Sequence, residues 1–393
     1  MVGAMRFPDG FLWGAATAAH QIEGGNVNND WWAAEHTPDT HCAEVSGDAC
    51  DSYHRYGEDI EILAGIGLSS YRFSLEWSRI EPEDGEFSYA ARDHYRRMVD
   101  ACLQAGVVPN VTIHHFTIPR WLDRRGGWRA PEAADRFVRL TEFVRPILER
   151  DVPYVCTFNE PNIAASFADL GRTDAPAIGL PAPDPEVSDT LVAAHHRSVE
   201  IIRGWGGPRV GWAVATQSFQ PEPGAEKEAA AYAYPRETRF LEEAGTDDWL
   251  GVQAYTRTRV GTDGPRPVPE DVERTLTGWE FYPEAVGQGL RAAAASAPGV
   301  PLLVTENGIA TDDDTRRIAY LRGALSAVHS AIESGLDVRG YYVWSLLDNF
   351  EWMMGYRPTF GIVAVDRTTF ARTVKPSAEM LGRIARANAL VAE

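Results

Sequence analysis

Leu302-Leu303-Val304-Thr305-Glu306-Asn307-Gly308 is a short apolar run that ends in a carboxylate. Residues 316–334, which follow it, have helical periodicity, so together the two segments are typical of a β-strand that leads into an α-helix. The same alternation of a β-rich run and a longer helical segment occurs about eight times along the 393 residues. Repeated βα units predict a parallel sheet, and eight of them predict an α/β fold closed into a single (β/α)₈ TIM barrel.

The bounds of these segments follow from the hydrophobic pattern and from the glycine and proline positions between them. The expected strands are residues 11–16, 69–75, 107–113, 154–158, 210–215, 249–254, 302–305 and 339–344. The expected helices are residues 52–65, 89–105, 131–149, 189–204, 236–245, 283–297, 316–334 and 377–390. Because no linker divides the chain, we expect residues 1–393 to form one catalytic barrel.

The composition excludes several classes of partner. The formal net charge is -19, so a nucleic acid or an anionic membrane surface would be repelled, and a neutral small molecule is the easier partner. The 12 Trp, 14 Tyr and 15 Phe supply aromatic faces that suit sugar rings, although most aromatic side chains in any protein fill its core. The hydrophobic share of 44% is that of a globular protein rather than a disordered chain.

The start of the chain and the four cysteines bear on location. No basic segment leads into a long apolar run near the start of the chain, so we expect no secretory signal and a cytoplasmic protein. Four cysteines are too few for a disulfide framework in a chain of this length.

One stretch of the sequence contains residue types that can bind a metal, but their spacing fits no regular ligand pattern. These residues are His36, His41, Cys42, Asp48 and Cys50. We therefore expect no metal and no cofactor.

In a TIM barrel the chemistry collects just beyond the C-terminal ends of the strands, so the residues that end each run carry most information. The fourth run ends in Asn159-Glu160-Pro161, and the seventh ends in Glu306. Two carboxylates at one cavity are what cleavage of a glycosidic bond requires, one to protonate the leaving oxygen and one to meet the oxocarbenium carbon. A separation of about 5 Å would give retention and roughly 6.5–9.5 Å inversion, and the sequence leaves that distance open.

Four long motifs occur in order along the chain. They are FLWGAATAAHQIEG at residues 11–24, TFNEP at 157–161, TENG at 305–308 and WSLLDNFEW at 344–352. These motifs resemble glycoside hydrolase family 1, the β-glucosidase and β-galactosidase family, and the resemblance runs from the first strand to about Asp366. Residues 29–32 and 114–117 resemble the archaeal branch of that family, and the region between Pro161 and Trp249 is shorter than in most relatives. The resemblance implies a TIM barrel and a retaining β-glycosidase.

The resemblance also implies a role for each matching residue. Glu160 matches the general acid/base, and Glu306 matches the nucleophile. Arg72 matches the arginine that contacts the nucleophile and keeps it anionic through nearby positive charge. Tyr255 matches the tyrosine that donates a hydrogen bond to the same carboxylate. Two identical side chains would then take two roles because their surroundings differ.

A sugar-binding shell is implied in the same way. The polar contacts to the sugar hydroxyls would come from Gln21, His115, Asn159, Glu351 and Trp352, and the platform under the ring from Trp344. Asn159 would contact the 2-hydroxyl, a hydrogen bond that strengthens at the transition state. Members that act on 6-phosphosugars usually have a serine at the place of Trp352, so an unphosphorylated sugar is expected.

The segment before Tyr255 departs from the family pattern. Gln253 and Ala254 stand where the family typically has Asn and Tyr, which lengthens one polar side chain by a methylene and removes an aromatic ring. A non-catalytic sugar-binding barrel is an alternative that rests on this departure alone. The presence of both glutamates argues against it, since binding needs neither a proton donor nor a nucleophile at those positions.

The leading hypothesis is hydrolysis of terminal unphosphorylated β-D-glucosides, with galactosides or fucosides as further substrates, by double displacement. A transglycosidase would use the same glycosyl-enzyme intermediate and pass the sugar to an alcohol instead of water. Product analysis with added alcohol separates these two. The partner is expected to be a small β-glycoside or an oligosaccharide, and the sequence leaves the aglycone, the preferred epimer at carbon 4 and the oligomeric state open.

Overall fold

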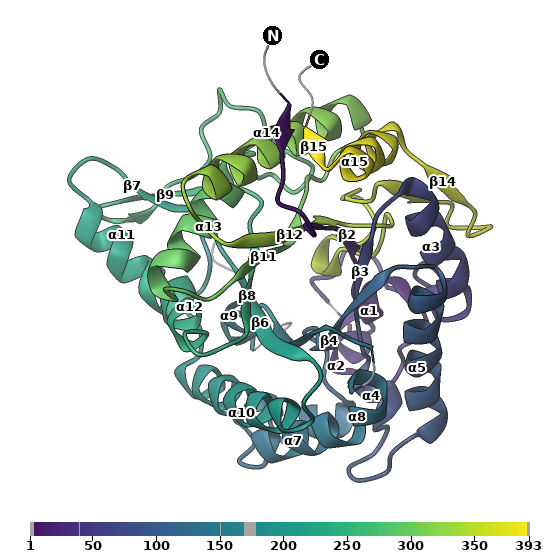
Figure 1. Cartoon of the computed structure of the whole chain (residues 1–393). Helices are drawn as coiled ribbons and strands as arrows, with labels where there is room; N and C mark the ends of the chain where they lie inside the picture. The colour runs from purple at the N-terminus through teal and green to yellow at the C-terminus, as the bar shows by residue number, and fades with distance from the viewer. Residues whose placement is uncertain (1–3, 39, 150, 169–177, 391–393) are drawn as a thin grey trace.

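The computed structural model describes residues 4–38, 40–149, 151–168 and 178–390. Eight parallel strands close into a barrel in which β12 pairs back onto β2 (Figure 1). The strands are β2 (Leu12–Ala16), β3 (Ser70–Ser74), β4 (Val108–His114), β5 (Tyr154–Asn159), β6 (Arg209–Ala215), β8 (Trp249–Gln253), β11 (Leu302–Asn307) and β12 (Val338–Trp344). The predicted TIM barrel is confirmed, and each expected strand is found within about two residues of its predicted bounds.

Side chains on the strands alternate between the inside and the outside of the barrel, as the two-residue period of a strand requires. On β5, Tyr154 and Cys156 join Trp249 and Leu303 in a cluster drawn from several strands, which fills the interior. Val155, between them, packs in the larger core that lies between the strands and the helices. The barrel is therefore filled below its C-terminal rim, and the rim is where polar side chains collect.

The outer helices surround the ring of strands (Figure 1). They are α3 (Ser52–Ile66), α5 (Tyr89–Gln104), α7 (Ala133–Phe143), α8 (Arg145–Leu148), α10 (Pro185–Gly204), α13 (Ala285–Ser296), α14 (Asp314–Glu333) and α15 (Pro376–Ala387). None of the described helices combines the length and the apolar character that crossing a bilayer would require.

Two predicted helices are wrong in extent because of prolines inside them. Residues 131–149 form α7 and α8 rather than one helix, since Pro146 has no amide hydrogen to continue the helical ladder. Residues 236–245 belong to a longer irregular segment made of α11 (Glu226–Ala233), the π-helical η2 (Tyr234–Thr238) and α12 (Arg239–Glu243). Pro235 lies in η2, and a wider turn is one way to accommodate a missing donor.

The last predicted helix, residues 377–390, is also too long. Helix α15 ends at Ala387, the next residue Asn388 adopts a left-handed conformation with φ of 47°, and β15 (Ala389–Leu390) then pairs with β1 (Met5–Arg6). This pairing places the two ends of the described chain side by side.

Short elements at the strand ends complete the fold. They are α1 (Ala19–Ile22), α2 (Asp30–Glu35), α4 (Trp77–Ile80), α6 (Arg120–Asp123), η1 (Gly127–Arg129), α9 (Pro161–Ser166), η3 (Trp352–Met354), β7 (Phe219–Pro221), β9 (Thr258–Gly261), β10 (Gly264–Pro265), β13 (Val363–Val365) and β14 (Arg372–Val374). Strands β7, β9 and β10 form one small sheet, and β13 and β14 form another. The sequence pattern did not predict these strands.

Candidate active site

Glu306 projects from the end of β11 and is held by two donors. Nη1 of Arg72 donates to its Oε1 at 2.6 Å, and the Tyr255 hydroxyl donates to its Oε2 at 2.6 Å. Glu306 is only 4% exposed, and Arg72 is fully buried. Burial raises the pKa of Glu306, whereas Arg72 and Tyr255 oppose that rise. Arg72 and Tyr255, two residues to which the sequence pointed, are thus brought from two other strands or strand ends to the Glu306 carboxylate.

The Asn159 side chain forms three hydrogen bonds with other residues of the site. Its Oδ1 accepts from Nη2 of Arg72 at 2.7 Å and from Nε2 of Gln253 at 2.8 Å. Because that oxygen receives two donors, the amide orientation is fixed and Nδ2 donates to Nε2 of His115 at 3.1 Å. Burial and the Arg72 charge hold the pKa of His115 well below its usual value, so the ring is neutral. Because its Nε2 accepts from Asn159, its proton is assigned to Nδ1.

Gln253 is a site residue that the sequence flagged only as a departure from the family pattern. In the barrel it pairs in register with Glu306 on the neighbouring strand, and its amide reaches Asn159 on β5. The extra methylene of glutamine therefore supports a polar contact across the barrel interior.

Glu160 directly follows β5 and begins α9. Its φ of 44° is left-handed, and its amide donates to the Ala213 carbonyl at 2.7 Å, so the strand turns into the helix at this residue. Among the described residues none donates a hydrogen bond to its carboxyl group. Burial raises the pKa of Glu160 well above the usual value, and the charges of Glu306 and Glu351 raise it further.

The two carboxyl groups therefore differ in their surroundings. A guanidinium and a phenol donate to the Glu306 carboxylate, while no residue in the described part of the chain donates to the carboxyl group of Glu160. Because the two carboxyl groups interact, they titrate as a pair, and the contacts of Glu306 with Arg72 and Tyr255 favour the state in which Glu306 is ionised and Glu160 is protonated. This is the division that acid-assisted attack on a glycosidic bond needs.

Aromatic rings and further polar groups form the rest of the rim. His115 stacks with Trp344 at a ring-centroid distance of 6.0 Å and with Trp352 at 6.3 Å. The Trp344 indole donates to Oε1 of Glu351 at 3.2 Å. Burial also raises the pKa of Glu351 well above its usual value. The glycone residues implied by the resemblance are therefore neighbours in the structure.

Gln21, His115 and Gln253 each have a buried polar atom without a partner among the described residues. Gln21 donates through Nε2 to Oδ1 of Asn349 at 3.0 Å and to the Phe350 carbonyl at 2.7 Å, while its Oε1 is buried without a partner in the described structure. Nδ1 of His115 and Oε1 of Gln253 are buried and unpartnered in the same way. Buried polar atoms are nearly always hydrogen-bonded, so these three atoms are exceptions to that rule within the described site.

Tyr255 is positioned by residues that the sequence analysis did not single out. The Tyr320 hydroxyl donates to the Tyr255 carbonyl at 2.6 Å. Asn307 donates to the Ala254 carbonyl at 2.5 Å and accepts from the Tyr341 hydroxyl at 2.7 Å. Asn307 belongs to the TENG motif, which was the only sequence signal for this support.

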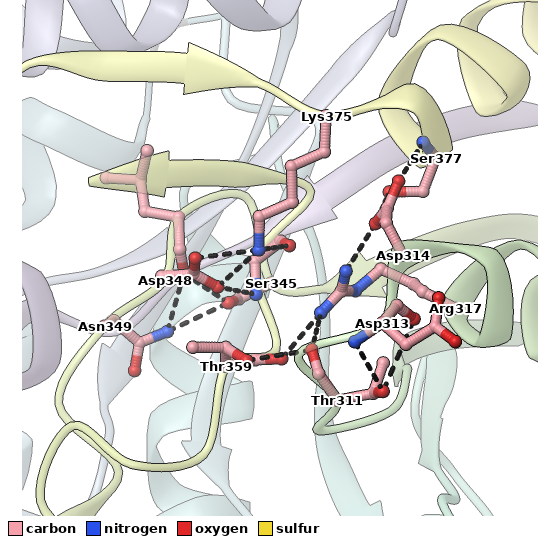
Figure 2. A network of polar contacts seen from close by, with 12 residues as sticks. Thr311, Asp313, Asp314, Arg317, Ser345, Asp348, Asn349, Thr359, Lys375 and Ser377 are labelled. Carbon is pink, nitrogen blue, oxygen red and sulfur yellow. Dashed lines mark hydrogen bonds and ion pairs between the residues drawn. The ribbon is translucent and has the colours of Figure 1, made fainter. Parts of the chain in front are cut away.

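A polar network ties the loop after β12 to the C-terminal helix (Figure 2). Nζ of Lys375 donates to Oδ1 of Asp348 at 2.9 Å and to the Gly361 carbonyl at 2.8 Å. Next to Asp348, Asn349 donates to Oγ of Ser345 at 2.9 Å and holds Gln21 through its Oδ1. The network thus supports the loop that carries Glu351.

The same network continues to the loop after β11 (Figure 2). Nη2 of Arg317 donates to the carbonyls of Thr311 and Thr359, each at 2.7 Å. Arg317 also pairs with Asp314, whose carboxylate accepts from the Ser377 amide at the start of α15 at 2.7 Å. Two rim loops and one helix are therefore joined by charged contacts.

Replacing Lys375 by methionine is expected to destabilise the fold. Asp348 is 17% exposed at its side chain and would lose its cation, so the free energy of unfolding should fall by about 1–3 kcal/mol. Chemical denaturation of the variant against wild type measures the change. Lys227→Met, at an exposed position on α11, is the control and should change stability by less than about 0.5 kcal/mol. Equal stability of both variants and wild type would contradict this role of the ion pair.

Within the described residues, no group of three or more His, Cys, Asp or Glu side chains is placed to hold a metal ion. The four cysteines are free, and three of them are buried.

The chain is similar to known proteins over almost its whole length. The sequence profile of glycosyl hydrolase family 1 matches residues 4–250 and 237–390. Thermostable beta-glucosidase B of Thermobispora bispora is 36% identical, over 99% of this chain and 92% of the relative. A bifunctional beta-D-glucosidase/beta-D-fucosidase of Bifidobacterium breve is 32% identical, over 95% of this chain and 96% of the relative. The crystal structure of a β-glycosidase, BGL167, superposes with a TM-score of 0.90 at 45% identity and covers 98% of this chain and 99% of that one.

Proposed function

Because the chain belongs to glycosyl hydrolase family 1, we propose that Glu306 is the nucleophile and Glu160 the acid/base of its active site. The enzyme is a retaining β-glycosidase, and its substrates are small glycosides. The observation that carries the assignment is the pair of short contacts from Arg72 and Tyr255 to the two oxygens of Glu306, against the absence of any donor to the Glu160 carboxyl in the described structure.

The proposed reaction has two steps. In the first, Glu160 gives its proton to the leaving oxygen while a Glu306 oxygen attacks the anomeric carbon, so that a covalent glycosyl-enzyme forms and the aglycone departs. In the second, the ionised Glu160 takes a proton from water, the water oxygen attacks the same carbon, and the bond to Glu306 breaks. Arg72 stabilises the Glu306 carboxylate before attack and after release.

The proposed glycone is an unphosphorylated terminal β-D-glucose. Glu351 is suited to accept from two adjacent hydroxyls, and Trp344 offers an indole face beside it. Trp352 occupies the place where a phosphate-binding member would have a serine. β-Fucosides are a second substrate class, supported by the likeness to the Bifidobacterium breve enzyme.

The test of the proposal is hydrolysis of 4-nitrophenyl β-D-glucoside followed by proton NMR. We expect β-glucose as the first product, followed by slow mutarotation, and little reaction with the 6-phosphorylated substrate. α-Glucose as the first product would exclude double displacement. Binding without release of 4-nitrophenol between pH 4 and pH 8 would leave only the sugar-binding alternative. Methyl β-glucoside formed on addition of methanol would measure the share of transglycosylation.

The dependence of kcat/KM on pH follows from the two carboxyl groups. Activity needs Glu306 ionised and Glu160 protonated, so it falls as pH drops through the pKa of Glu306 and as pH rises through the pKa of Glu160. Both pKa values are raised from the usual 4.5, and that of Glu160 is raised the more. We therefore expect a bell-shaped profile whose maximum lies above pH 4.5, measured with an aryl glucoside at low substrate concentration. A maximum below that value would contradict the proposed protonation states.

Replacing Gln253 by methionine is expected to lower kcat about tenfold with little change in KM. The variant keeps the side-chain volume and removes the donor to Asn159, whose contact with the 2-hydroxyl would matter most at the transition state. Steady-state kinetics on an aryl glucoside separate the two constants. The matched control is Gln288→Met, which removes a polar contact to Gln220 instead. A rise in KM alone would mean that Gln253 stabilises the bound substrate and the transition state equally.

A cytoplasmic location is also proposed. Its support is the free state of all four cysteines, which is the usual state in a reducing compartment.

A further inference from the structure

The indole of Trp352, the first residue of η3, is a proposed sugar contact whose position depends on packing. Trp352 is only partly buried and has a left-handed backbone with φ of 53°. Within the described residues its ring makes no hydrogen bond and is held by other rings, among them Phe116 at a centroid distance of 5.3 Å. A left-handed conformation at a bulky residue persists only where the surroundings fix it. The groups packed around this ring therefore decide where its exposed face lies.

His20 lies nearly flat against the Trp352 indole. The two rings are 15° from parallel, and their centroids are 5.5 Å apart. His20 belongs to α1, directly precedes Gln21 and is only 1% exposed. None of the roles proposed above for the glycone site involves His20. It is thus a buried ring packed against a partly exposed one.

Helix α2 contacts both nitrogens of the His20 ring. Asn29, the N-cap of α2, has its Nδ2 at 2.9 Å from Nδ1 of His20, and its Oδ1 accepts from the Trp32 amide at 2.8 Å. Because that oxygen is already an acceptor, Nδ2 donates to His20, and the imidazole proton is assigned to Nε2. Oε2 of Glu35, the last residue of α2, lies 3.7 Å from that Nε2, within reach of electrostatic attraction. The two ends of one helix therefore orient the ring.

The same helix also supports Trp352 and the segment that carries it. Trp31 of α2 packs against the Trp352 ring with centroids 4.7 Å apart. Oε1 of Glu35 accepts from the Ser46 hydroxyl at 2.5 Å, and the Ser46 carbonyl accepts from the hydroxyl of Tyr356, just beyond η3. Helix α2 is therefore joined to the indole through two rings and to the end of η3 through a chain of hydrogen bonds.

We propose that His20 is a positioning residue for Trp352. Oriented by Asn29 and Glu35, its ring fixes the indole in the orientation that the sugar meets, and it raises the affinity for the glycone without touching it. The proposal rests on the proposed function, because it takes Trp352 as a contact to the sugar.

Fluorine NMR of the full chain labelled with 5-fluorotryptophan tests the position of the ring. The Trp352 resonance is the one missing from the spectrum of Trp352→Leu. We expect one narrow resonance in wild type and a broadened or split one in His20→Ala, because an unsupported indole takes several orientations. Loss of the imidazole ring current alone would move the resonance and keep it single. His20→Phe keeps a ring against the indole and removes both nitrogens, so it should broaden the resonance as well, though less. A narrow resonance in either variant overturns the proposal.

Titration calorimetry with deoxynojirimycin, a glucose-shaped amine, measures the consequence for binding. Loss of one aromatic contact corresponds to a change of about three- to tenfold, so His20→Ala should weaken binding by that factor. In the Trp352→Leu background the same change should cost no further affinity, since His20 acts through that ring. An equal loss in both backgrounds would mean that His20 acts through its neighbour Gln21, and unchanged affinity in His20→Ala would mean that it does not act on binding. Either result overturns the proposal.

His94→Phe is the matched control. His94 is 5% exposed and stacks on Tyr53, which is not among the residues proposed to bind the sugar, with centroids 3.8 Å apart and 16° between the rings. The control should keep the Trp352 resonance narrow and the affinity unchanged, and effects equal to those of His20→Ala would overturn the proposal. The denaturation midpoint checks the folding of each variant, and His20→Phe carries both measurements if His20→Ala does not fold. Neither measurement needs turnover, so wild type that binds deoxynojirimycin without hydrolysing aryl glucosides would contradict the proposed function alone.

Discussion

Glu306→Gly is expected to lose at least about 10⁴-fold in kcat on 4-nitrophenyl β-D-glucoside, since the proposed mechanism has no other group to form the covalent intermediate. The variant should regain glycosyl transfer when azide is added, because azide fits the space of the missing carboxylate and attacks the anomeric carbon from the face that Glu306 occupied. Glu160 remains to protonate the leaving oxygen. The product should therefore be the α-glucosyl azide, identified by its anomeric proton coupling.

The loss must be separated from unfolding, because removal of Glu306 leaves the fully buried Arg72 with one partner fewer. The remaining contact of Arg72 to Asn159 at 2.7 Å should keep the guanidinium in place. Circular dichroism and the denaturation midpoint of the variant check this directly. A folded variant that retains wild-type hydrolysis, or one that gives β-azide, would contradict Glu306 as nucleophile.

The barrel could be predicted from the sequence because each strand is short, apolar and bounded by polar residues, glycine or proline. β11 illustrates this, since a run of Leu and Val ends in Glu306-Asn307-Gly308. The interruptions at Pro146 and Pro235 were missed because the hydrophobic pattern continues across them, whereas the backbone ladder cannot. The small sheets of β7, β9 and β10 and of β13 and β14 were missed because their strands are only two to four residues long.

The site residues that lie in a recognisable motif could be predicted from the sequence. The contacts that depend on how the strands are aligned in the barrel could not. Glu160 and Glu306 end their runs, so the sequence placed them at the rim. The contact of Gln253 with Asn159 joins residues 94 positions apart and depends on which strands face each other across the barrel. Taken alone, a departure from the family pattern indicates the loss of a contact. In the structure, however, the Gln253 amide donates a hydrogen bond to Asn159. Lys375 was not predicted for the same reason, since its partner Asp348 lies on a different loop.

Glu160→Ala is the second large effect, and its size should depend on the leaving group. General acid catalysis contributes about 10²–10⁴-fold, so an unactivated alkyl glucoside should lose that much or more. A 2,4-dinitrophenyl glucoside, whose phenolate leaves without protonation, should lose little in the first step and accumulate the glycosyl-enzyme. The second step is slow in this variant because water lacks its general base. Rates over a series of aryl glucosides of graded phenol pKa measure this dependence.

Azide again distinguishes the roles, because it needs no base to attack. In Glu160→Ala it should react with the glycosyl-enzyme formed on Glu306, from the face that the aglycone left, and give the β-azide. The alkaline limb of the pH profile should disappear as well, because the group whose raised pKa produces it is gone. Opposite anomers from the two variants can arise only if one glutamate bonds to the sugar and the other moves protons. The same anomer from both would mean that the protein does not divide its two glutamates in this way, whatever their contacts.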